Sequence, residues 1–427
     1  MAKKKAEQPK RELTKRQLSH WQQQKKRQRL LLGAGIAIII AVLVTVGGGV
    51  YNQRYKPLRE TVIEVNDTKF DMGYYIKMLK LYGSGVPGQQ LYNLTDWVVK
   101  AIEQGELVRQ EAMKLGISVS DKEVDKKLKS YNPPLSKDYR DVVRTQMLVG
   151  KLSEEYFGKQ VPTSAEQRHI LAMFLEGESQ ASEVRARLEA GGNFTQVASV
   201  LSLDATCKEK KGDLGWRPEG VLPLLLGTNL VEEYAFSCEV GALSQPILDE
   251  TKTKPVGYWL IKVLERDEQA GGAKVNVMLL GSEEEASEVR TKLEASEVRG
   301  KLEASEDFAT LAKEFSQHDE SKEKGGYFEV SLDMMGPAFK EFTLRSELNV
   351  LSQPIRDDTV STKGGYWLVK VSEIDNNRQI ADEDRNLLKA DALNKWVEGL
   401  FDAPGNKITS YLDEGKKLFA VTHILGD

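Results

Sequence analysis

The sequence predicts an α+β protein that is anchored in a membrane by an N-terminal transmembrane helix. Three observations predict this class: an uncharged apolar segment near the N-terminus, a following region with helical spacing of apolar residues, and an internal duplication of about 100 residues. Each duplicated copy runs strand, helices, a glycine-containing loop, a helix and two strands. We therefore expect a helical domain followed by two small domains, each with an antiparallel sheet flanked by helices.

The apolar segment at residues 30–50 contains no charged residue. At about 1.5 Å per residue it spans roughly 30 Å, the hydrocarbon thickness of a bilayer. A cleaved signal peptide is the competing interpretation, but the segment exceeds a typical signal core of about 7–15 residues and no A-x-A site follows it. Residues 1–29 carry eleven basic and two acidic residues, which favours a cytoplasmic N-terminus. We predict a single-pass anchor in the cell membrane, with the bulk of the chain outside the cytoplasm.

The charge balance argues against binding to nucleic acid. The chain has 60 Lys+Arg and 64 Asp+Glu, so its formal net charge is −4. Without the basic tail the remaining 398 residues carry 49 basic and 62 acidic groups, and such an acidic body is a poor partner for a phosphate backbone. Four widely spaced histidines predict no metal site, and we expect no cofactor. The two cysteines, Cys207 and Cys238, could pair or remain free.

Residues 60–160 have the pattern of a helical domain. Alternation at 60–70 predicts a short strand and turn, and helical spacing after Thr95 predicts a helix that ends at Gly116. A capping box at Ser120 to Glu123 begins the next helix. Prolines 133 and 134 then interrupt the helical pattern. A separate helical segment is expected at residues 378–427.

The duplication defines two copies, at residues 165–267 and 272–375. ALSQPILDETKTKPVGYWLIKVLERD in the first copy matches VLSQPIRDDTVSTKGGYWLVKVSEID in the second. The second copy also holds a nine-residue tandem, EASEVRTKL and EASEVRGKL. Nine residues advance a helix by two and a half turns, so only one of these apolar pairs can face the sheet unless the helix breaks near Gly300.

Five pieces of the first copy carry a family resemblance. They are RHIL, SLD, GDLGW, LSQP and GYWLIKV, which occur in this order between residues 168 and 263. The set resembles a parvulin-type peptidyl-prolyl isomerase domain, and the whole chain resembles SurA/PrsA-type extracytoplasmic foldases. This resemblance implies a chaperone-like helical domain at 60–160 and two parvulin-like domains. It also implies unfolded or partly folded proline-containing polypeptides as partners.

In the first copy the resemblance implies a catalytic pair. The parvulin pattern has a first-strand histidine, an Asp or Cys after the second helix, and a last-strand histidine. His169 and Asp204 occupy the first two positions, whereas Trp259 replaces the last histidine. Tryptophan cannot replace an imidazole as a hydrogen-bond acceptor, so we expect weak activity. The expected substrate-binding residues of the two copies are Leu214, Trp216, Leu226, Val231, Trp259, Met335 and Phe339.

The second copy departs further from the parvulin pattern. Asn276 stands at the first-histidine position, His318 at the Asp/Cys position, and Trp367 again replaces the last histidine. Met335 and Phe339 match the proline slot of the family. We therefore expect the second copy to be a degenerate module that binds proline segments.

These observations favour a prolyl isomerase and foldase over two alternatives. Rotation about an X–Pro bond faces a barrier of about 18–20 kcal/mol, and a site that binds the twisted amide better than either planar isomer lowers it. The missing histidines favour instead a chaperone that holds unfolded chains without catalysis. A tethered scaffold in an envelope assembly is the third possibility.

Overall fold

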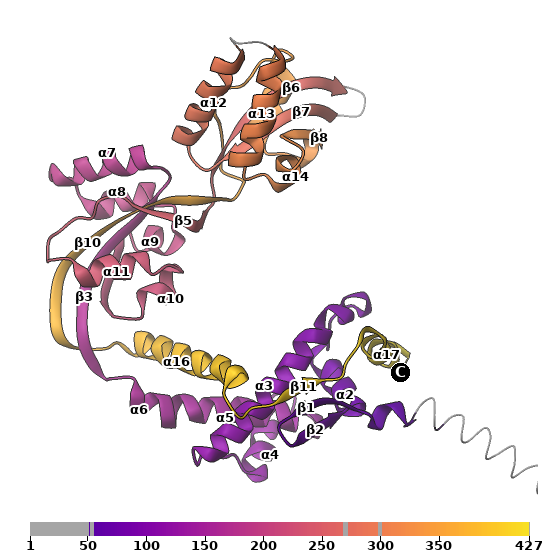
Figure 1. The fold of residues 1–427 in the computed structure, drawn as a ribbon. Coiled ribbons are helices and arrows are strands. Elements are labelled where there is room, and N and C mark those ends of the chain that lie inside the picture. The colour runs from indigo at the N-terminus through magenta and orange to yellow at the C-terminus, as the bar shows by residue number, and fades with distance from the viewer. Residues whose placement is uncertain (1–50, 52–54, 268–271, 298–300, 427) are drawn as a thin grey trace, which may run out of the picture. The chain divides into compact units, whose positions relative to one another are not determined.

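The computed structural model describes residues 51, 55–267, 272–297 and 301–426 (Figure 1). The predicted basic tail and membrane anchor lie outside these residues. Among the described helices, none combines the length and apolarity that crossing a bilayer requires. The chain divides into two compact units, residues 1–155 with 393–427 and residues 156–392.

The first unit is a helical domain with a small sheet, as its sequence pattern predicts. The sheet has three strands in the order β11-β1-β2. The elements of this unit are η2 (Pro57–Arg59), β1 (Thr61–Val65), β2 (Thr68–Asp71), α2 (Met72–Tyr82), η3 (Gly88–Leu94), α3 (Thr95–Lys114), α4 (Asp121–Lys129), η4 (Lys137–Tyr139), α5 (Arg140–Lys151), η5 (Leu152–Phe157), β11 (Ile408–Ser410) and α17 (Glu414–Gly426).

Local signals in this unit are confirmed at several element ends. Helix α3 begins at Thr95, and Gly116 beyond its end has a φ of 75°, which favours glycine. The Ser120 hydroxyl accepts from the Glu123 amide, and the Glu123 carboxylate accepts from the Ser120 amide at 2.7 Å, as a capping box requires. Trp97, in contrast, belongs to the apolar stripe of α3 but is 53% exposed, with its ring edge against Tyr82.

The C-terminal segment is part of this unit rather than a separate one. Strand β11 pairs antiparallel with β1, so Ile63 lies opposite Ser410. The Tyr411 amide donates to the Val62 carbonyl at 2.8 Å, and Lys417 forms an ion pair with Asp96 at 2.9 Å. The expected boundary at residue 378 lies within the second unit, because β10 extends to Gln379 and the chain joins the first unit only from residue 393.

The second unit contains two four-stranded antiparallel sheets, in the orders β4-β3-β10-β5 and β8-β7-β6-β9. Its elements are α6 (Gly158–Gln160), β3 (Ser164–Leu175), α7 (Glu178–Glu189), α8 (Phe194–Leu201), α9 (Ala205–Glu209), β4 (Asp213–Pro218), α10 (Leu222–Leu226), α11 (Leu230–Ser237), β5 (Ile247–Lys254), β6 (Gly257–Asp267), β7 (Gly272–Leu280), α12 (Glu283–Glu297), α13 (Lys301–Phe315), α14 (Asp319–Lys322), β8 (Tyr327–Ser331), η6 (Leu332–Met334), α15 (Pro337–Arg345), β9 (Ile355–Asp357) and β10 (Thr362–Gln379). Helix α16 (Asp382–Asp402) follows and crosses the boundary between the units.

The two copies exchange their last strands. Strand β6, from the first copy, pairs with β7 and β9 of the second, and β10, from the second copy, pairs with β3 and β5 of the first. Neither 165–267 nor 272–375 is therefore a closed sheet unit. We call residues 164–254 with 362–379 the outer domain and residues 257–357 the nested domain.

The exchange is possible because the last strands are nearly identical, GYWLIKV at 257–263 and GYWLVKV at 365–371. Either strand presents the same alternation of side chains to either sheet. The two chain segments that pass between the domains, near residues 254–256 and 362, also contact each other. Thr362 pairs with Lys254 in the ladder, its hydroxyl donates to the Val256 carbonyl, and the Lys254 ammonium donates to the Glu176 carbonyl at 2.8 Å.

Each sheet is covered on both faces. In the nested domain, Val289 and Leu293 of α12 are buried with Leu280 and Phe308 on one face. Trp259 and Phe339 pack on the opposite face. The first pair of the tandem repeat thus faces the sheet. The predicted break near Gly300 lies outside the described residues, between the end of α12 and the start of α13.

Candidate functional site

His169 lies on strand β3 of the outer domain and has other partners than the expected one. Its Nε2 lies 2.8 Å from the Asp213 Oδ1, and its ring stacks on Trp216 at 5.6 Å between ring centroids. Trp216 is covered in turn by the guanidinium of Arg378, 4.3 Å from its ring centroid. Two predicted site residues, His169 and Trp216, are therefore together, but in a partly exposed stack.

The structure does not bring His169 to Asp204. The two neighbours of His169 in the strand face α11, since Ile170 packs in the core there and Arg168 donates to the Ala235 carbonyl. Side chains alternate along a strand, so His169 points to the opposite face of the sheet. The expected catalytic pair is thus not formed.

Equivalent backbone hydrogen bonds in the two domains show which positions of their first strands correspond. The Ala172 amide donates to the Gly212 carbonyl, and the Val277 amide donates to the Gly326 carbonyl, so Ala172 and Val277 are equivalent. On this register the counterpart of His169 is Lys274 rather than Asn276. The letters HIL in the first copy therefore do not mark the same strand position as NVM in the second.

Asp204 instead closes the outer domain's site with Lys252. Its Oδ2 lies 2.8 Å from the Lys252 ammonium, and its Oδ1 accepts from the Cys207 amide at 2.8 Å. The Lys252 ammonium also donates to the Leu226 carbonyl at 2.5 Å and lies 5.6 Å from the Trp367 ring centroid. Asp204 is only 6% exposed, so its carboxylate is buried in this ion pair.

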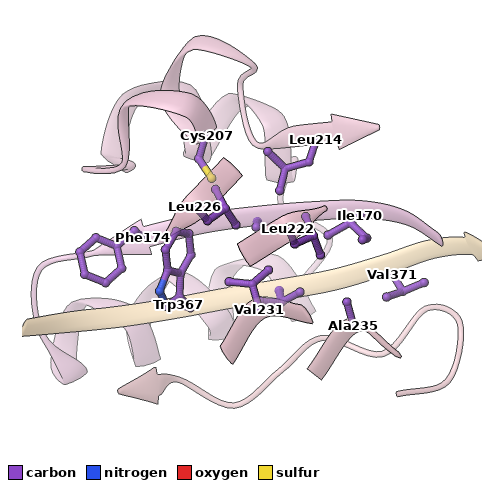
Figure 2. Packing of buried hydrophobic residues seen from close by; sticks show 12 residues of the cluster. Ile170, Phe174, Cys207, Leu214, Leu222, Leu226, Val231, Ala235, Trp367 and Val371 are labelled. Atoms are coloured by element: carbon purple, nitrogen blue, oxygen red, sulfur yellow. The ribbon is translucent and has the colours of Figure 1, made fainter. Parts of the chain in front are cut away.

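The predicted slot residues of the outer domain lie in its solid core. Leu214, Leu226 and Val231 are buried around Trp367 (Figure 2). Figure 2 shows Leu214, Leu226 and Val231 beside the neighbouring strands β3 and β10, in the same cluster as Trp367. These predicted slot residues are at most 1% exposed and pack in the core instead of lining an open slot.

A tryptophan–aspartate pair recurs in both domains. The Trp367 Nε1 donates to the Asp249 Oδ2 at 3.2 Å, and the Trp259 Nε1 donates to the Asp357 Oδ2 at 3.1 Å. The other carboxylate oxygen accepts from a threonine hydroxyl two residues later in each case. Because of the strand exchange, Trp259 serves the nested domain although it belongs to the first copy. By these equivalences, Val360 of the nested domain occupies the position that Lys252 has in the outer domain.

The nested domain has an open cavity at the equivalent position. Its volume is about 470 Å³, and its apolar wall is formed by Trp259, Leu279, Met335 and Val360. His318 also lines it, at the position of Asp204. Phe339 is buried directly behind, with its ring centroid 5.1 Å from that of Trp259. Three predicted substrate-binding residues, Trp259, Met335 and Phe339, are therefore brought together.

His318 is held on two sides by aromatic rings. Its ring centroid lies 5.2 Å from that of Trp259 and 4.9 Å from that of Phe328, and its Nδ1 lies 2.9 Å from the Ser321 hydroxyl. Burial lowers the pKa of His318 and outweighs the opposite effect of Glu320 and Asp319. The cavity thus presents a neutral imidazole beside an apolar wall at neutral pH.

His318 is expected to make the stability of the nested domain depend on pH. Its pKa in the folded state lies below the ordinary 6.5, so between these two values the unfolded chain binds the proton more readily. Stability is then lost as pH falls from neutral to below the ordinary pKa of histidine. Urea unfolding at neutral and at mildly acidic pH measures the effect. If His318→Gln shows an unchanged pH dependence, the assignment to His318 is wrong.

Sequence reasoning missed Lys252, which pairs with Asp204 in the outer domain, and Val360, which lines the cavity of the nested domain. The sequence alone contains this difference, because an alignment of DETKTKPVGYW with DDTVSTKGGYW puts Lys252 and Val360 at the same position. Cys207 and Cys238 are free thiols. Burial raises the pKa of the Cys207 thiol, so it remains protonated at neutral pH, and we assign it no chemical role.

Comparison with protein families matches three parts of the chain. Residues 169–265 and 258–375 each match the PPIC-type PPIASE domain, and residues 20–148 match the SurA-like N-terminal domain. Two segments of the chain thus match PPIC-type PPIASE domains, and a segment that precedes them matches the SurA-like N-terminal domain, in a chain with an α+β fold.

Curated relatives carry foldase and chaperone names. The Foldase protein PrsA of Caldanaerobacter subterraneus subsp. tengcongensis is 32% identical over 182 residues, which are 39% of this chain and 55% of that protein. The Chaperone SurA of Pseudomonas syringae pv. tomato is 25% identical over 381 residues, or 75% of this chain and 85% of that protein. This chain spans 55% of the length of the PrsA relative and 55% of a SurA relative from Chromohalobacter salexigens.

Among solved structures, the match with the peptidylprolyl isomerase PrsA of Bacillus anthracis covers 76% of this chain and 94% of the PrsA chain. Its identity is 12% and its TM-score is 0.29. A likeness at that level carries no inference about site or function.

Proposed function

We propose that this protein is a membrane-anchored, extracytoplasmic foldase that binds unfolded, proline-containing polypeptides and accelerates their prolyl isomerisation. Residues 30–50 would hold it in the cell membrane with the N-terminus in the cytoplasm, and the described residues would face the clients. The two PPIC-type domains and the SurA-like domain support the class of function. The open cavity of the nested domain is the single observation that carries the proposed site.

The chemistry of the cavity suits a weak isomerase. Its apolar wall can hold a proline ring and remove water from the imide bond, because Trp259, Leu279, Met335 and Val360 offer no charge. The neutral imidazole of His318 stands beside this wall. A twisted imide, which has lost conjugation, gains more from such a site than either planar isomer does, and this difference lowers the barrier.

The outer domain would contribute little to isomerisation. Lys252 and Asp204 neutralise each other in its buried site, and separating them would leave an uncompensated buried charge. We therefore propose the nested cavity as the site of isomerisation, in place of the expected catalytic pair of His169 and Asp204. We assign a structural role to the outer domain, in which β10 of the second copy pairs with β3 and β5 of the first.

Val360→Lys tests this proposal, because it places in the nested cavity the residue that closes the outer site. The full chain in detergent is added to a refolding protein whose slow phase is proline-limited, and the acceleration of that phase is measured. We expect the substitution to lower the acceleration by about tenfold or more. Val350→Lys, the same change at an exposed valine outside the cavity, should leave it intact. An equal rate in wild type and Val360→Lys would remove the proposed site.

One observation favours the second function, a chaperone that holds clients without catalysis. Neither PPIC-type site of this chain carries the pair of histidines expected from the parvulin pattern, since tryptophans occupy both last-strand positions. In that case the full chain would suppress aggregation of an unfolded client and would not change the proline-limited rate. Both measurements on one client decide between the two functions.

A further inference from the structure

The rim of the nested cavity carries two carboxylates, Asp319 and Glu320. They follow His318 directly on α14, both are exposed, and both line the cavity together with Trp259 and Met335. Their charges act on the cavity, because both raise the pKa of His318 against the larger effect of burial. The apolar wall and the acidic rim therefore belong to one site.

No cation balances this rim inside the cavity. The lining residues of the described cavity include neither lysine nor arginine. Its third carboxylate, Asp357, is held by the Trp259 indole and by the Thr359 hydroxyl. Within the described residues, Asp319 and Glu320 form no ion pair with a neighbouring side chain. Their negative charge is therefore available to a bound chain.

The outer domain lacks this negative charge at the same place. The counterparts of Asp319 and Glu320, which follow Asp204, are the uncharged Ala205 and Thr206. Its site is filled by the cationic Lys252. The acidic rim is thus a property of the nested cavity and not of the duplicated fold, although both copies share their strands and helices.

We propose that the nested cavity selects proline segments in which a lysine or arginine neighbours the proline. The proline ring would lie against the apolar wall, and the cationic side chain would lie at Asp319 and Glu320. Charge complementarity of this kind fixes the register of a bound chain and suppresses partners of the wrong sign. The inference rests on the proposed function, of which it names the substrate class.

Three fluorescent peptides test this inference in anisotropy titrations with the full chain in detergent. They are identical proline-containing peptides with Lys, Gln or Glu before the proline. Two exposed carboxylates predict that the Lys peptide binds about three- to tenfold more tightly than the Gln peptide and that the Glu peptide binds more weakly. The preference should shrink at high salt. It should vanish in Asp319→Asn with Glu320→Gln.

Matched variants separate the inference from the proposed function. Glu314→Gln with Glu323→Gln removes two exposed charges outside the cavity and should keep the preference. Val360→Phe fills the cavity without adding charge and should weaken all three peptides. If all three peptides bind equally and Val360→Phe still weakens them, the acidic-rim inference is overturned and the proposed site stands. If none of the peptides binds, the proposed function is overturned with it.

Discussion

Cysteines introduced by Lys262→Cys and Asn276→Cys are expected to form a disulfide, whereas those introduced by Lys262→Cys and Leu171→Cys are not. Residues 262 and 276 lie directly opposite each other in the β6–β7 ladder, a separation at which cysteines can be bridged. In a chain with contiguous copies, β6 would pair with β3 instead, because Leu171 lies opposite Lys370 of the equivalent strand. The two variants therefore give opposite results for the two connectivities.

The measurement is oxidation of each variant with Cys207 and Cys238 replaced by serine, followed by peptide mapping. A matched third variant, Lys370→Cys with Leu171→Cys, should cross-link as the first one does. Cross-linking of residues 262 and 171 in the folded monomer would show contiguous copies and would contradict the strand exchange.

Replacement of Trp259 by alanine is expected to destabilise the nested domain by about 3–5 kcal/mol, although this tryptophan belongs to the first copy of the sequence. Its side chain is 1% exposed and packs with Phe339, Ile261 and Val277 of the nested core. The substitution leaves a large cavity and an Asp357 carboxylate without its indole donor. Trp367→Ala should have the same effect on the outer domain, whose core surrounds that residue.

Hydrogen exchange measured by mass spectrometry distinguishes the two variants. Trp259→Ala should reduce protection in α15 and β7, and Trp367→Ala in α11 and β3, because these elements share a core cluster with the replaced tryptophan. If Trp259→Ala loosens α11 and β3 instead, the assignment of each tryptophan to its domain is reversed.

Much of the fold could be predicted from the sequence because its signals are local. The capping box at Ser120, the start of α3 at Thr95 and the alternation at residues 60–70 each depend on neighbours a few residues away. The duplication likewise predicted the first strand, the helices and the last two strands of both copies, but it missed β4 and β8, which occupy the expected glycine-containing loops. Trp97 is an exception, since spacing alone does not tell a buried stripe from an exposed position beside Tyr82.

The strand exchange could not be predicted, because two nearly identical strands satisfy either sheet and only the three-dimensional path of the connections distinguishes them. The alignment of the first strands failed because it rested on a short motif. His169 matches the family's letters, but the hydrogen bonds of Ala172 and Val277 show that the equivalent position in the second copy is Lys274, two residues before the expected Asn276. The nested cavity has Val360 at the position where Lys252 pairs with Asp204 in the outer domain, and family motifs do not include this position.

The central claim is that proline segments bind in the nested cavity against Trp259. Fluorine NMR of the full chain labelled with 5-fluorotryptophan tests it most directly, with signals assigned through Trp259→Phe and Trp367→Phe. On titration with a proline-containing peptide, we predict that the Trp259 signal shifts and the Trp367 signal stays in place. A shift of the Trp367 signal alone, or no shift of either signal at saturating peptide, would contradict the account.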